Sequence, residues 1–152
     1  MSPRPAFLAM AALALAGLLA SAGTAGQPAM PGVASPAQAR VDYMLKCQGC
    51  HQPDGSGNIA NTPPLKDTVA RFLHVPGGRE FLGRVPGVAS TDLGDARLAQ
   101  LLNWTIYRFD PGHVPTGFEP YTEAEVARLR ADPLRLERAG LRAALVSRMA
   151  TH

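Results

Sequence analysis

Apolar residues recur at helical spacing in several parts of the chain, and this pattern predicts an all-α fold. The clearest segment runs from Asp95 to Phe109, where leucine, isoleucine and phenylalanine side chains fall on one face. Shorter segments with the same spacing begin near Ser35, Asp67, Thr122 and Leu134. Glycine and proline are frequent, 15 and 14 of 152 residues, so we expect short helices joined by long loops.

Two helix starts carry the signature of a capping box. Ser35 is followed three positions later by Gln38, and Thr122 by Glu125. In such a box the hydroxyl accepts from the backbone of the third helical residue, whose own side chain reaches back to the cap. The first predicted helix leads directly into Cys47.

Residues 1–25 have the organisation of a secretory signal peptide. A basic start precedes a short apolar stretch, and small residues before Ala22 and Ala25 offer two cleavage sites. The apolar stretch is too short to cross a bilayer as a helix, so a membrane anchor is the weaker interpretation. We therefore expect export to the periplasm, with residues 26–34 as a flexible leader.

The chain has two cysteines, and both lie in the run Cys47-Gln48-Gly49-Cys50-His51. This pattern lets two thiols add across the vinyl groups of one haem while the adjacent histidine ligates the iron. A thioredoxin-like redox pair would need a surrounding βαβ pattern, and a structural zinc site would need a second pair of soft ligands. The sequence shows neither, so covalent haem c is the predicted cofactor.

Charge changes the picture at the C-terminal end. The formal net charge is +3, and between Arg128 and Arg148 six basic residues face Asp132 and Glu137. Basic residues are not interleaved with aromatic ones, so nucleic acid is not expected as a partner. The segment 133–152 is predicted to be a basic helical extension, either a solvated face packed by its leucines or a docking surface for an acidic partner or an anionic membrane.

With these residues in place, the chain resembles the class I monohaem cytochrome c family of bacteria and mitochondria. The resemblance covers Pro36 to Asp132 and rests on the haem motif, Gly55-x-Gly57, Pro63-x-Leu65 and two later helices. It implies a small all-α domain, residues 35–132, of short helices wrapped around one haem. It also implies that Pro63 offers its carbonyl to the proximal histidine, His51.

The sixth ligand of the iron departs from this family. Relatives usually supply a methionine from the loop before the last helix, but no methionine occurs here between His51 and Arg148. His113 lies between the helices predicted at 95–109 and from Thr122, so we expect it to be the sixth ligand, with His74 as runner-up. The remaining candidates are less plausible: Met30, Met44 and Met149.

The leading functional hypothesis is a periplasmic electron carrier between a dehydrogenase or reductase and a downstream acceptor. No nucleophile–base pair or nucleotide-binding loop appears, so an enzyme is not predicted. A second hypothesis is a haem protein with an open or weakly held sixth position, which binds a small ligand or reacts with peroxide. A third is a haem subunit of a larger complex, docked through its basic C-terminal helix.

Overall fold

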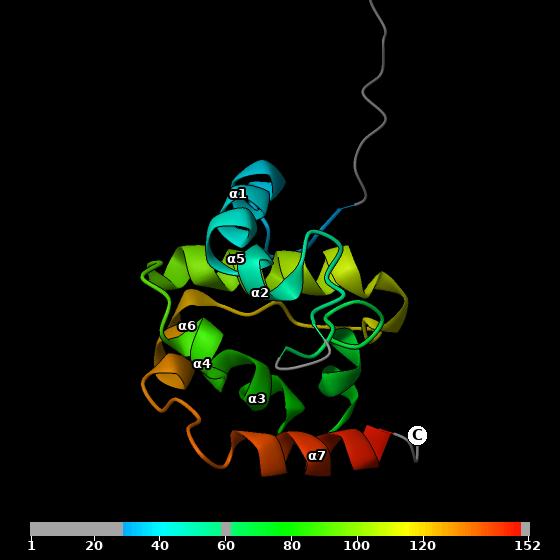
Figure 1. The fold of residues 1–152 in the computed structure, drawn as a ribbon. Coiled ribbons are helices and arrows are strands. Elements are labelled where there is room, and N and C mark those ends of the chain that lie inside the picture. The colour runs from blue at the N-terminus through cyan, green and yellow to red at the C-terminus, as the bar shows by residue number, and fades with distance from the viewer. Residues whose placement is uncertain (1–28, 59–61, 150–152) are drawn as a thin grey trace, which may run out of the picture.

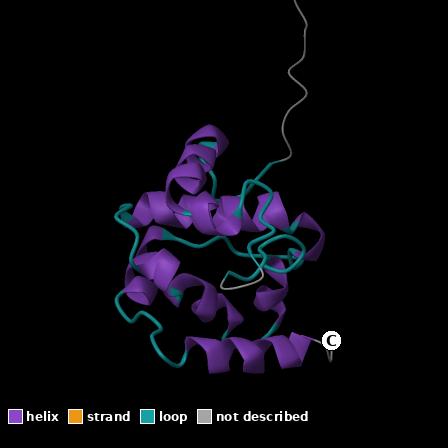
Figure 2. Cartoon of the chain, in the orientation of Figure 1, coloured by secondary structure: helices purple, strands orange, loops and turns teal. Residues whose placement is uncertain are grey.

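The computed structural model describes residues 29–58 and 62–149 of the chain. The predicted signal peptide, residues 1–25, and the first part of the leader lie outside the described residues. In the described part there is no β-strand, only an isolated bridge between Asn58 and Thr62, which confirms the all-α prediction (Figure 2). The elements are α1 (Pro36–Lys46), α2 (Gln48–His51), the 3₁₀ helix η1 (Ala70–His74), α3 (Gly78–Arg84), α4 (Pro86–Ala89), α5 (Asp95–Phe109), the 3₁₀ helix η2 (Pro111–His113), α6 (Glu123–Arg130) and α7 (Arg138–Met149). None of the helices in these ranges is both long and apolar enough to cross a membrane.

Helix α1 packs across α5, and an aromatic cluster fills the crossing (Figure 1). The ring centroid of Tyr43 lies 5.5 Å from that of Trp104 and 4.9 Å from that of Phe109. Beside the cluster, the buried carboxylate of Asp42 pairs with Arg97 of α5 through two hydrogen bonds. Truncating one partner of such a pair would leave a buried charge without compensation, so the pair fixes how the two helices cross.

The predicted helix starts are present, but their capping boxes are only half formed. The Ser35 hydroxyl accepts from Gln38 N at 3.2 Å, and the Thr122 hydroxyl accepts from Glu125 N at 3.2 Å. The side chains that were expected to reach back do not: Gln38 Nε2 donates to Asp42 at 3.1 Å, and the Glu125 carboxylate binds Arg79 of α3 at 2.6 Å. Tertiary partners take these side chains away from the local cap.

Helix α6 is held between α5 and α3 by its buried residues and by the segment that enters it. Asn103 of α5 is fully buried, and its side chain binds the backbone of Tyr121 in both directions, at 2.8 and 3.0 Å. The Tyr121 hydroxyl donates to Arg79 O at 2.7 Å, which connects the same segment to α3. The predicted helix at 95–109 is therefore the central support of the domain.

The basic C-terminal helix α7 packs along η1, at the opposite side of the molecule from α1 and α2 (Figure 1). Its Leu145 is fully buried in a second apolar cluster with Phe72, Phe81 and Leu134. The connection to α7 is tied to α3, because Leu134 N donates to the Arg84 carbonyl at 2.9 Å. The segment thus covers a face of the domain through apolar contacts.

Replacing Leu145 with alanine removes the centre of this cluster. We expect Leu145→Ala to lower the free energy of unfolding by about 2–5 kcal/mol, because a buried leucine loses its contacts and leaves a cavity. The matched control is Val146→Ala, whose side chain is 37% exposed and should change stability by less than about 0.5 kcal/mol. Denaturant unfolding of the purified protein measures both, and equal losses would show that α7 does not pack as described.

Candidate haem site

A cavity of about 850 Å³ lies under the aromatic crossing and is walled by most elements of the domain. The apolar face of α5 contributes Leu98, Leu102 and Ile106, and the opposite wall comes from η1, α3 and α4. A volume of this size lies in the range of about 300–1,000 Å³ that is usual for small-molecule and cofactor pockets. The lining is mainly apolar, which suits a large and flat apolar group.

Both cysteines and His51 line this cavity because α1 ends where the motif begins. Cys47 is the last cap of α1, and its N–H donates to Tyr43 O at 2.9 Å. The single turn of α2 follows and brings His51 N to Cys47 O at 2.9 Å. Cys47 is half-buried and Cys50 is exposed, so this edge of the cavity reaches the protein surface.

The protonation states at the motif follow from burial. Desolvation, assisted by the charges of Asp42 and Cys50, raises the pKa of Cys47 to about 11. Desolvation also lowers the pKa of His51, and the nearby carbonyl of Pro63 partly opposes this change. The histidine is therefore neutral at physiological pH, which is the form that ligates metal ions.

His51 Nδ1 is buried and has no hydrogen-bond partner of adequate distance and angle among the described residues. Although the Pro63 carbonyl is near enough to affect the pKa of the ring, it does not meet hydrogen-bond geometry. We give the geometric result more weight, because the pKa effect includes weaker and longer contacts. Pro63 itself lines the cavity next to His51, as the resemblance implies.

The loop after His51 is folded back by its own backbone. Gly57 N donates to His51 O at 3.0 Å, and Leu65 N donates to Gly55 O at 2.8 Å. Gly57 has a φ of +69°, and a Cβ there would lie 2.3 Å from the Thr62 carbonyl oxygen and 2.9 Å from that of Pro63. Only glycine allows this approach, which places Pro63 beside the proximal histidine.

The structure does not bring His113 or His74 to the cavity. His113 Nδ1 lies 2.5 Å from the buried Asp110 carboxylate, and His74 Nε2 lies 2.8 Å from the His113 carbonyl oxygen. The two histidines therefore form a hydrogen-bonded group at the η1–η2 contact. The expectation that one of them supplies the sixth ligand is not supported by their positions.

The described methionines are also absent from the cavity lining. Met30 packs against the main core, Met44 is exposed, and Met149 packs against the second cluster. Conversely, the structure reveals two lining residues that we did not single out as site residues, Arg138 and Arg142 of α7. Their i, i+4 spacing in the basic segment was the available signal.

The alternatives to haem fit this site poorly. In the described ranges no group of three or more histidine, cysteine or acidic side chains could hold a metal ion, so a structural zinc site is not formed. The helical surroundings of the motif lack the βαβ unit of a thioredoxin-like pair. Two thiols at one edge, a neutral histidine with an unpaired buried nitrogen and apolar walls are the features that a covalently attached haem requires.

Comparisons with known proteins agree with this geometry. The chain is 35% identical to a cytochrome c-552 from Thermus thermophilus over 107 residues, which cover 59% of this chain and 82% of that protein. It is equally similar, 35% over 107 residues, to a cytochrome c-552 from another record of the species, 72% of which is covered. No family model matches the chain, and no solved structure matches it.

The fold and the site define a c-type cytochrome with one haem. The chain belongs to the class I monohaem cytochrome c family. It is an electron carrier with covalently bound haem c.

Replacing Gly57 tests how the loop presents Pro63 to the proximal side. We expect Gly57→Ala to destabilise the protein by more than the roughly 1–2 kcal/mol of left-handed backbone strain, because the Thr62 and Pro63 carbonyls must also move. The control is Gly117→Ala, at a φ of +76° with nothing within 4 Å, which carries the strain alone. Unfolding free energies and the visible spectrum are compared, and identical results for both variants would contradict the close approach.

Proposed function

We propose that the protein is an exported, periplasmic electron carrier in which Cys47 and Cys50 form the thioether links and His51 is the proximal ligand. The observation that carries this assignment is the shared cavity, which all three residues line together with Pro63. The predicted signal peptide, residues 1–25, supports export, since c-type haem is attached where thiols are handled outside the reducing cytoplasm.

The bound haem supplies one-electron exchange between ferric and ferrous iron. The chain's part is to hold the cofactor rigidly, exclude water and set the reduction potential through the axial ligand and the surrounding dielectric. The buried aromatic crossing at Tyr43 and the apolar face of α5 do this from one side, and η1 with α3 does it from the other. No separate substrate site is needed, so we propose a carrier and not an enzyme.

An apolar patch beside the haem motif supports docking of a redox partner at that edge. Val41, Met44 and Leu45 of α1 are 47%, 49% and 71% exposed, and Cys50 is also exposed. Exposed apolar residues next to a redox centre favour a short-lived contact that brings two cofactors close together. We propose a dehydrogenase or reductase as the partner. Docking through the basic C-terminal helix stays a prediction.

Serine substitution of the cysteines tests the attachment. A single Cys47→Ser or Cys50→Ser change should leave one vinyl group unsaturated and shift the pyridine haemochrome band to longer wavelength. The double variant should lose all haem on denaturation, as measured by mass spectrometry, and should be largely unfolded because its helices pack on the cofactor. Met44→Ser, at an exposed position on the preceding helix, is the control. A folded double variant that keeps haem after denaturation would refute the assignment.

A specific observation favours a second candidate function, a haem with an open sixth position that binds a small ligand. Among the described residues that line the cavity, His51 is the one histidine and there is no methionine. Lys46 also lines the cavity, but its ammonium group is paired with Asp92 at 2.7 Å. The wall formed by Leu82, Val85 and Pro86 offers no ligating side chain.

Spectroscopy of the holoprotein distinguishes the two candidates. An open position predicts high-spin ferric iron and rapid carbon monoxide binding to the ferrous form, and His113→Ala and His74→Ala should leave both unchanged. Low-spin iron that ignores carbon monoxide would exclude the open site. In that case the spectra of His152→Ala show whether this residue, which lies outside the described ranges, is the ligand.

A further inference from the structure

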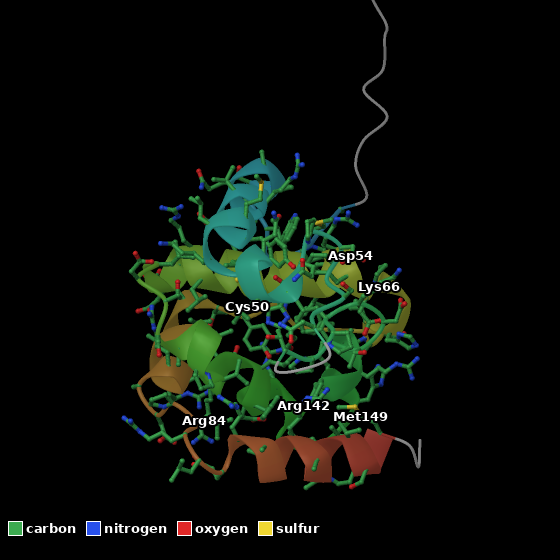
Figure 3. All side chains as sticks on the ribbon, in the orientation of Figure 1. Cys50, Asp54, Lys66, Arg84, Arg142 and Met149 are labelled. Atoms are coloured by element: carbon green, nitrogen blue, oxygen red, sulfur yellow. The ribbon has the colours of Figure 1, made fainter. Side chains whose placement is uncertain are left out.

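The cavity has a cationic end, formed by Arg138 and Arg142 of α7. The two residues are four apart in one helix and therefore project from the same face. Figure 1 shows α7 on the far side of the molecule from α2, which carries Cys50, and Figure 3 shows Arg142 close to α7 and well away from Cys50. The cysteines and the two arginines thus line opposite ends of one cavity.

These two guanidinium groups lack the carboxylate partners that other arginines of the protein have. Arg79, Arg84 and Arg130 each bind a carboxylate within 2.9 Å. In the described part of the chain neither Arg138 nor Arg142 has a side-chain hydrogen bond or ion pair, and Arg142 lies only over the Phe72 ring, 6.0 Å from its centroid. A pair of unneutralised cations in the wall of a mostly apolar cavity points to an anionic group that belongs there.

The cofactor carries its charges where these arginines lie. In haem the two vinyl groups occupy one edge of the porphyrin, and the two propionates occupy the opposite edge. If the vinyl edge is bound at Cys47 and Cys50, the propionate edge points to the other end of the cavity. We propose that Arg138 and Arg142 bind the haem propionates, one guanidinium to each carboxylate. This inference rests on the proposed attachment at the cysteines.

Helix α7 is held in a position that suits this role. Leu145 and Leu134 anchor it in the cluster with Phe72, and Phe72 also lines the cavity. Arginine pairs with carboxylates in a fixed, often bidentate geometry, so two of them one turn apart can fix both propionates. The extension then closes the end of the haem pocket that the cysteines leave open.

The pairing has an electrostatic signature in the reduction potential. Nearby positive charge favours ferrous iron, because reduction lowers the net charge of the haem. It also holds the propionates in their ionised form. Other ionisable groups line the cavity at the motif end, among them Tyr43 and Lys46, and these are the same in all variants compared below.

The test is the double variant Arg138→Gln, Arg142→Gln in the holoprotein. We expect its midpoint potential to fall, and to fall further as the pH rises, because unpaired propionates titrate closer to neutrality and their negative charge favours ferric iron. The double variant Arg138→Lys, Arg142→Lys keeps the charges and should retain most of the wild-type potential. Haem content is first measured in the wild-type protein, since absence of haem there would refute the proposed function and not only this inference.

The charge-matched control is Arg128→Gln, Arg135→Gln, which removes two exposed arginines that do not line the cavity. Equal potentials and equal pH profiles for this control and the cavity double variant would overturn the proposal. If the glutamine double variant does not mature, each single variant is measured in its place. A shift in neither single variant, relative to Arg128→Gln, overturns it as well.

Discussion

The packing of Tyr43 at the crossing of α1 and α5 is the contact on which the rest of the site depends. Its ring lies against both Trp104 and Phe109, and its hydroxyl donates to Gln52 O at 2.6 Å. One side chain therefore joins the first helix, the central helix and the residue that follows the haem motif. Since Cys47 is the cap of α1, this packing sets where the motif meets the cavity. Burial raises the pKa of Tyr43 to about 12, so the hydroxyl keeps its proton as a donor.

Local sequence signals predicted the elements well where the signal is itself local. The helix at 95–109 has the expected bounds, because its apolar face is long and regular. Both hydroxyl caps formed, since they depend only on residues three apart. The side chains of Gln38 and Glu125 went instead to Asp42 and Arg79, and no spacing rule reveals such partners before the fold is known. Propensity fixes the start of a helix, whereas tertiary contacts choose among the hydrogen bonds open to a side chain.

The order of helices in space explains why the sixth-ligand prediction failed to reach the cavity. The family places its ligand loop before the last helix, and we took α6 as that helix. In the structure α5 is the helix that packs across α1, so the loop that precedes it, and not the one with His113, borders the cavity. Three Val-Pro pairs occur in the relevant part of the chain, and only Val85-Pro86 lines the cavity. Periodicity does not distinguish α5 from α6; the choice is made by which helix meets Tyr43.

The C-terminal extension changes how the pocket is enclosed. The main core holds the cavity from above through α1 and α5, and a separate cluster around Phe72 and Leu145 holds α7 on the other side. Because the two clusters share few contacts beyond Leu82, movement of α7 would open one end of the cavity without disturbing the crossing that positions Cys47. The motif end is thus set by the more extensive core, while the cationic end is set by a smaller one. Charged groups at that end lie on the less strongly anchored wall, where a change in packing alters their distance from the cofactor and so its reduction potential.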